Sequence, residues 1–226
     1  MKLASSTASR EDKPRFGIDE PPAIGGVWKR GFDVFGALAA LIVFSPLFLM
    51  LGILVKLSDG GSVLYRHGRI GRNGRVFDCL KFRTMVPNGD EVLAAHFARY
   101  PEARDEWLAT RKLKDDPRVT RVGIVLRKLS LDELPQIYNI LIGDMSIVGP
   151  RPVVKKELEF YGKAASYYLK SRPGLTGLWQ ISGRNDVSYA QRVAYDMHYV
   201  ENWSIVFDMK IILRTVPVVV AARGSY

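Results

Sequence analysis

The sequence predicts an α+β, mostly helical fold with a membrane helix, a β-hairpin and interfacial amphipathic helices. Three observations support this prediction: an uncharged apolar run at residues 34–55, an Asn73-Gly74 turn between two alternating apolar runs, and helical periodicity over residues 189–222. Hydrophobic residues make up 47% of the 226 residues and charged residues 25%, as in chains that fold. A wholly disordered chain is therefore excluded.

The chain divides into three parts. Residues 1–27 are polar and rich in Ser, Pro and charge, and we expect a flexible N-terminal tail there. Residues 28–58 are predicted to form the membrane helix. Residues 59–226 are predicted to form a cytoplasmic domain that ends in interfacial helices.

The uncharged run is long enough to cross a bilayer. Its 22 residues would extend about 33 Å as a straight helix, against a hydrocarbon core of about 30 Å. A cleavable signal peptide is excluded, because the run begins only at residue 34 and is too long for a signal sequence.

A Ser45-Pro46 pair lies near the middle of this run. Proline removes a backbone hydrogen bond and bends the helix, and a serine hydroxyl can bond to the carbonyl that is freed. Lys29 and Arg30 precede the run and Lys56 follows it, whereas a spanning helix concentrates basic residues on one side. We interpret the flanking basic residues as groups that face lipid and hold the helix to the cytoplasmic face. The residues alone leave open a helix that enters and leaves on one face and a kinked single-pass anchor.

Residues 62–85 are predicted to form a hairpin, because Asn-Gly between alternating runs is a strong hairpin signal. The glycines around this turn match neither G-x-G-x-x-G nor the P-loop. Cys79 lies in an apolar-alternating run and is expected to be a buried structural thiol. As the chain has one cysteine, an internal disulfide is excluded.

Two later segments are also predicted to be helical. Residues 91–114 form a charged stretch, expected to be an exposed insertion, to which the sequence assigns no role. Residues 115–117, Asp-Asp-Pro, end it. Near the C-terminus, Asp208, Lys210 and Arg214 interrupt an apolar stretch, which suits a helix in the membrane interface better than one that crosses.

The formal net charge of +10 and a pI near 9.7 indicate an anionic partner: nucleic acid, anionic lipid or a phosphorylated substrate. No helix-turn-helix, RRM or zinc-finger pattern is found. A membrane-tethered nucleic-acid binder and a membrane scaffold remain as alternatives to an enzyme.

The densest candidate chemistry is the acidic pair Asp132-Glu133. Ser130 and Glu133 form an S-x-x-E capping box, which predicts a helix from Leu131 and explains both carboxylates without any function. Alternatively, Asp132 could attack phosphorus, because a carboxylate at a helix N-terminus is expected to keep a low pKa and stay ionised, provided that cations offset the negative charge of the phosphate. The candidate cations near short motifs are Lys81, Arg83, Arg127, Arg151, Arg172 and Arg184.

Three motifs occur in order: KFRTM, LRKLSLDELPQIYNILIGDMSIVGPRP and RPGLTGLWQISGRN. Together they resemble the bacterial sugar transferase family, polyprenyl-phosphate sugar-1-phosphate transferases that begin glycan assembly on a lipid carrier. The resemblance extends from about Trp28 to the C-terminus, and the length is similar to that of the exopolysaccharide-type members. Several of these use UDP-galactose or UDP-glucose.

The resemblance implies a monotopic protein at the cytoplasmic face of the bacterial inner membrane, with a re-entrant helix broken at Ser45-Pro46. It implies that Asp132 attacks a UDP-sugar, releases UMP and forms a phosphosugar-aspartate. Undecaprenyl phosphate then takes up the hexose-1-phosphate, which starts exopolysaccharide repeat-unit assembly. Glu133 would act as a base or tune a Mg²⁺ site that includes Asp132.

The partners so implied are a UDP-sugar, undecaprenyl phosphate and membrane lipids, without nucleic acid. Galactose and glucose both remain candidates, and the oligomeric state stays open, a homo-oligomer included. The residues expected to bind substrate or phosphate, by resemblance or by charge, are Lys81, Arg83, Arg127, Arg151, Arg184 and Asp196.

Overall fold

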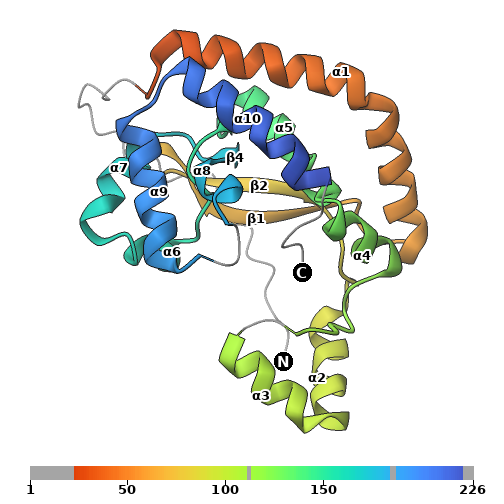
Figure 1. Ribbon diagram of the computed structural model, residues 1–226. Coiled ribbons are helices and arrows are strands. Elements are labelled where there is room, and N and C mark those ends of the chain that lie inside the picture. The colour runs from red at the N-terminus through yellow and green to blue at the C-terminus, as the bar shows by residue number, and fades with distance from the viewer. Residues whose placement is uncertain (1–22, 111–112, 184–186, 221–226) are drawn as a thin grey trace.

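The computed structural model describes residues 23–110, 113–183 and 187–220. It is mostly helical, as the sequence predicts, and it has two small sheets (Figure 1). The elements are α1 Gly26–Asp59, β1 Leu64–Ile70, η1 Arg72–Gly74, β2 Val76–Phe82, α2 Gly89–Arg99, α3 Pro101–Thr110, α4 Arg121–Lys128, η2 Leu131–Glu133, α5 Gln136–Ile142, β3 Ser146–Val148, α6 Lys155–Glu159, η3 Gly162–Ala164, α7 Ala165–Lys170, β4 Gly174–Thr176, α8 Leu178–Ile181, α9 Tyr189–Glu201 and α10 Ile205–Val220.

Helix α1 is long and apolar enough to cross a membrane, and it bends instead of breaking at proline. Figure 1 shows it running across the top of the molecule and then turning down one side. Pro46 cannot donate to the carbonyl of Ile42, and Ser45 Oγ donates to that same oxygen at 2.8 Å. The predicted compensation by serine is therefore confirmed.

Both ends of α1 pack against the same folded domain. Near its start, Ala37 joins a core cluster with Phe77 and Ile137. Near its end, Leu51 and Val55 join a second cluster under β2 and α4. The turns between these contacts expose large apolar side chains to the surroundings. Leu41, Leu47 and Phe48 of the same turns pack against these clusters, so both halves of the bent helix contact one domain.

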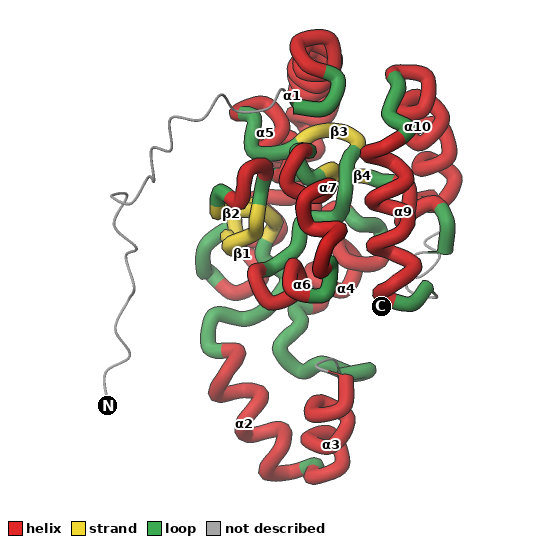
Figure 2. Tube along the Cα trace, turned by 90° about the vertical axis from the view of Figure 1, so that its left-hand side faces the viewer, coloured by secondary structure: helices red, strands yellow, loops and turns green. Residues whose placement is uncertain are grey.

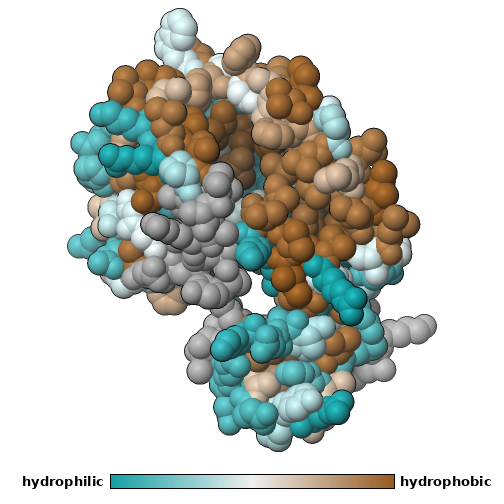
Figure 3. Space-filling view, turned by 45° about the vertical axis from the view of Figure 1, so that its right-hand side comes forward, coloured by the Kyte–Doolittle hydropathy of each residue, from teal (hydrophilic) through white to brown (hydrophobic). Residues whose placement is uncertain are grey.

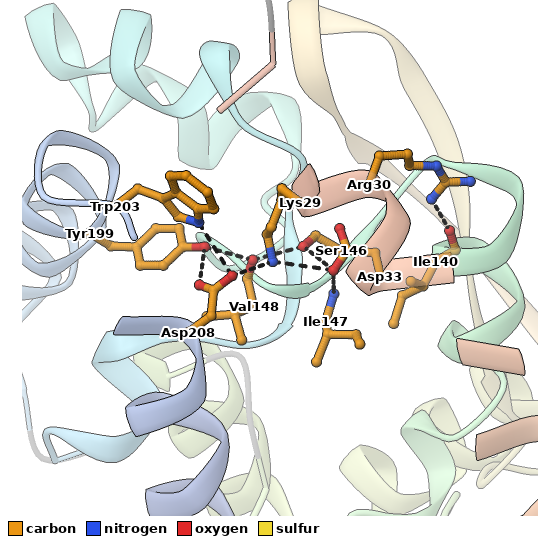
Figure 4. A network of polar contacts seen from close by, with 10 residues as sticks. All are labelled: Lys29, Arg30, Asp33, Ile140, Ser146, Ile147, Val148, Tyr199, Trp203 and Asp208. Atoms are coloured by element: carbon orange, nitrogen blue, oxygen red, sulfur yellow. Dashed lines mark hydrogen bonds and ion pairs between the residues drawn. The ribbon is translucent and has the colours of Figure 1, made fainter. Parts of the chain in front are cut away.

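A buried polar network holds the first turns of α1 (Figure 4). Lys29 Nζ lies 2.7 Å from Asp208 Oδ2 of α10 and 3.2 Å from Asp33 Oδ1. Asp33 also accepts hydrogen bonds from Ser146 Oγ and the Ile147 amide of β3. The network therefore joins the membrane helix, the second small sheet and the C-terminal helix.

The N-terminal basic flank is consequently not directed at lipid headgroups, contrary to our interpretation of the sequence. Lys29 is buried in this network, and Arg30 donates to the carbonyls of Ile140 and Leu141 at the end of α5. A charge count along the chain does not distinguish basic residues that face lipid from those that face protein.

The predicted hairpin is confirmed. β1 and β2 pair antiparallel, and the turn at Arg72–Gly74 places Asn73 and Gly74 at positive φ. Cys79 is buried as expected, and burial raises the pKa of its thiol to about 11.

A second sheet was not predicted. β3 and β4 are three-residue parallel strands from the GDMSIVGPRP and RPGLTG motifs. Gly149 and Gly174 bring the two backbones so close that a Cβ on either residue would clash with the other strand's backbone. Strands this short show no detectable period.

The insertion is a helical pair, α2 and α3, which projects from the body as an arm (Figure 2). Figure 3 shows this mostly hydrophilic arm below an extended apolar surface. The exposed apolar side chains on α1, α4 and α10 include Phe35, Ile42, Leu57, Ile124, Val125, Val206 and Leu213.

Candidate functional site

The acidic pair lies on a 3₁₀ turn. The predicted capping box is absent: Ser130 adopts positive φ and its side chain caps nothing. The helix α5 begins only after Pro135, which lacks the N–H that a continuing helix would need. Asn139 of α5 exchanges hydrogen bonds with the backbone of β2 at Asp78 and Leu80, so α5 and the turn before it are fixed against the hairpin.

One cavity of about 1190 Å³ opens beside this turn. Its lining combines the ends of β2 and α4, the turn η2 and helix α8 with the base of the arm. Six residues predicted from the sequence line it together: Lys81, Arg83, Arg127, Asp132, Glu133 and Arg151.

Lys81 lies between the two carboxylates. Its Nζ is 2.6 Å from Glu133 Oε1 and 3.6 Å from Asp132 Oδ2. Burial alone would lower the pKa of Lys81, but the two carboxylates outweigh it and raise that pKa. Lys81 therefore stays cationic beside the acidic pair.

Asp132 is largely buried, and this desolvation raises the pKa of its carboxyl group. Lys81 and Arg127 act in the opposite direction and favour the ionised form, whereas Glu133 favours the protonated form. The pKa was expected to stay low at a helix N-terminus; the short turn gives less help than a full helix would.

The other cations are held by neighbours. Arg127 donates from Nε to Thr84 Oγ1 at 2.9 Å. Arg83 is paired with Asp59, the last residue of α1. The guanidinium of Arg151 stacks 5.2 Å from the ring centre of Trp179.

Two predicted residues lie elsewhere, and a third is not described. Asp196 does not line the cavity; it is buried behind it, where it accepts a 2.7 Å hydrogen bond from Tyr161 Oη. Arg172 donates to Gly143 O, away from the cavity. Arg184 falls outside the described residues.

Sequence reasoning missed several lining residues. Thr84, Trp179 and Gln180 stand inside the quoted motifs and could have been found there. The lining residues at the base of the arm could not have been found, because they belong to no motif. They are Asn88, Gly89, Asp90, Glu91 and Arg118.

Within the described part of the chain, no three His, Cys, Asp or Glu side chains gather as a metal site. Mg²⁺ does not require such a cage, because it commonly binds through one or two carboxylates plus substrate phosphates. Asp132, whose carboxylate borders the cavity, fits that donor set.

The chain was compared with known proteins. A model described as bacterial sugar transferase matches residues 24–222. The exopolysaccharide production protein ExoY of Rhizobium meliloti (strain 1021) is 62% identical over 229 residues, across 100% of both chains. The undecaprenyl-phosphate galactose phosphotransferase of Salmonella typhimurium is 52% identical, over 88% of this chain and 41% of that protein. The UDP-glucose:undecaprenyl-phosphate glucose-1-phosphate transferase of Caulobacter vibrioides is 38% identical, over 88% and 72%.

Proposed function

The chain belongs to the bacterial sugar transferase family, and from this we propose that it moves a hexose-1-phosphate from UDP-galactose or UDP-glucose to undecaprenyl phosphate. It is a phosphoglycosyltransferase of the exopolysaccharide type. The observation that carries the proposal is the cavity in which Asp132 lies among Lys81, Arg127 and Arg151.

In the first step, a carboxylate oxygen of Asp132 attacks the sugar-bearing phosphorus of the UDP-hexose. A bond forms between that oxygen and phosphorus, the bond to the bridging oxygen breaks, and UMP leaves with the electron pair. The negative charge that gathers on phosphorus requires cations nearby. Lys81 and Arg127 act electrostatically on Asp132, which supports this assignment.

In the second step, a phosphate oxygen of undecaprenyl phosphate attacks the same phosphorus. The bond to Asp132 breaks, and the carboxylate is regenerated as the polyprenyl diphosphosugar forms. The product would start a repeat unit of an exopolysaccharide.

Glu133 holds Lys81 through its 2.6 Å contact, and we assign it this positioning role in preference to that of a base. Asp132 and the diphosphate oxygens would hold Mg²⁺, which when bound would offset the phosphate charge. With or without bound Mg²⁺, Lys81 would provide a positive charge beside Asp132.

We also propose that α1 is re-entrant and that the protein lies on the cytoplasmic face of the inner membrane. The chain is membrane-associated through this long apolar helix. Two contacts of one bent helix with one domain support the re-entrant arrangement, because the far end of a straight spanning helix would lie about 30 Å away across the hydrocarbon core.

Replacement of Asp132 by Asn tests the chemistry. We expect turnover to fall at least about a thousandfold, as when other enzymes lose a nucleophile, while the protein stays folded. UDP-hexose without lipid acceptor should release about one UMP per wild-type active site and leave labelled sugar on the protein.

The matched control is Asp78→Asn, an exposed carboxylate on the neighbouring β1–β2 hairpin, which should keep full activity. A scaffold or a simple helix cap would lose at most about 1 kcal/mol of stability in Asp132→Asn and would show no change in UMP release. A panel of UDP-sugars assayed for UMP release separates galactose from glucose.

A further inference from the structure

Arg83 is set apart from the other cations of the cavity by its place at the end of the membrane helix. Asp59, the last residue of α1, accepts hydrogen bonds from Arg83 Nη2 and from the Gly61 amide. Arg83 is only 9% exposed, yet it lines the cavity. This ion pair therefore joins the membrane helix directly to the candidate active site.

The turn after α1 is shaped around this guanidinium. The backbone at Gly61 lies directly against the guanidinium of Arg83, and a Cβ there would displace that guanidinium from its present position. Lys56 Nζ donates to the carbonyls of Gly60 and Gly61 and holds the same turn from the other side. Arg83 is thus fixed in position before any ligand binds.

Strand geometry separates Arg83 from the cations at Asp132. The amide of Arg83 donates to Val63 O, which continues the hairpin pairing one residue beyond β2. Lys81 and Arg83 are two residues apart, so both face the cavity, roughly 7 Å apart along the strand, while Phe82 between them is in the core. Lys81 contacts the acidic pair, and Arg83 contacts the end of α1.

The surface near Arg83 includes exposed apolar side chains. The last turns of α1 expose Leu54 and Leu57, and the neighbouring α4 exposes Val125 and Leu129. A lipid that carries a phosphate at one end can keep its chain on such a surface while its headgroup enters the cavity.

We propose that Arg83, positioned by Asp59, binds the phosphate of the polyprenyl phosphate acceptor, whereas Lys81 and Arg127 serve the UDP-hexose at Asp132. This assignment rests on the proposed function. Asp59 uses one of the five N–H donors of the guanidinium, which leaves others for phosphate oxygens. Asp59 is a positioning residue, since it acts on the lipid only through Arg83.

The test compares Arg83→Gln with the wild-type protein in nanodiscs, with both substrates varied. We expect the KM for undecaprenyl phosphate to rise at least about tenfold, as for loss of one charged hydrogen bond, and the KM for UDP-hexose to change less than twofold. The UMP burst without acceptor should be unchanged. Arg83→Lys should recover part of the acceptor KM, and Asp59→Asn should raise it by a smaller factor.

Arg66→Gln is the matched control, because Arg66 lies on the same hairpin, is exposed and does not line the cavity. It should leave both KM values unchanged. Binding of Arg83→Gln to vesicles that contain phosphatidylglycerol should equal that of wild type; a parallel loss of vesicle binding would mean that Arg83 holds ordinary lipid headgroups, and would overturn the proposal.

A raised KM for UDP-hexose, or a lost UMP burst in Arg83→Gln, would place Arg83 at the donor and also overturn it. Failure of the proposed function gives a different result, since the wild-type protein itself would then release no UMP. If wild type turns over without a burst, the KM comparison still decides whether Arg83 serves the acceptor.

Discussion

The two ends of α1 are each tied to the domain by aspartate and a cation, but in opposite surroundings. At the first end, Lys29 is 4% exposed between Asp33 and Asp208, both fully buried. At the other end, Asp59 holds Arg83 at the wall of an open cavity. Charges that are sealed from solvent can only hold the fold together, whereas a paired charge on a cavity wall remains available to a ligand.

The largest loss of stability should come from breaking the buried ion pairs at the first end of α1. Lys29→Met leaves two buried carboxylates without their cation, and we expect it to lower the free energy of unfolding by about 3–5 kcal/mol. Lys56→Met, at the open end, is the matched control and should change it by less than about 1 kcal/mol. Unfolding in detergent measures both, and equal losses in the two variants would contradict the comparison.

Asp196 extends the comparison to a buried aspartate without an ion pair among the described contacts. Burial, opposed by the Tyr161 hydrogen bond, raises the pKa of its carboxyl group to about 7, above the ordinary value of 3.8. The folded state then holds a proton that the unfolded state releases, so stability is greatest below about pH 4 and falls as the pH rises to about 7.

We expect this group to remove about 3 kcal/mol of stability between pH 5 and pH 8. Asp196→Asn should abolish that part of the pH dependence, which unfolding experiments across this range would measure. A variant that keeps the wild-type slope would show that other groups are responsible.

The bend between the two ends should contribute less. Ser45→Ala leaves the Ile42 carbonyl without the serine donor, and we expect a loss of about 1 kcal/mol. Ser58→Ala is a control within the same helix, because Ser58 Oγ makes the same type of bond to Val55 O on a turn whose backbone hydrogen bonds proline does not interrupt. Thermal unfolding in nanodiscs measures the stability of both variants. Equal losses of stability would mean that the serine hydrogen bond matters no more beside Pro46 than elsewhere in the helix.

The smallest change in stability is expected at the open end. Asp59→Asn should change the free energy of unfolding by less than about 1 kcal/mol, because the asparagine Oδ1 can still accept a hydrogen bond from Arg83, and the guanidinium borders the open cavity, where water can solvate it. Its effect should appear instead in the acceptor KM. A stability loss as large as that of Lys29→Met would show that the ion pairs at the two ends of α1 contribute equally to the stability of the fold.

Local sequence was informative where one short segment decides the outcome. The apolar run, the Asn-Gly turn, the serine beside proline and the buried Cys79 all depend on neighbours along the chain, and the structure agrees with each prediction. Six of the charged residues on the cavity wall were also named, since they stand in two of the three recognisable motifs.

The failures have a common physical cause. Lys29 and Arg30 were interpreted as a lipid-facing flank, but their partners lie on α10 and α5, more than a hundred residues away. The parallel pair β3 and β4 exists because two glycines let distant backbones meet.

The sequence by itself determined that this chain has a bent apolar helix, a hairpin and an acidic pair with many cations near motifs. Only the tertiary structure decided which cation faces which partner: Lys81 the acidic pair, Lys29 a buried triad, and Arg83 the end of the membrane helix. Charge is a property of each residue, but its use depends on burial and on neighbours that only folding brings together.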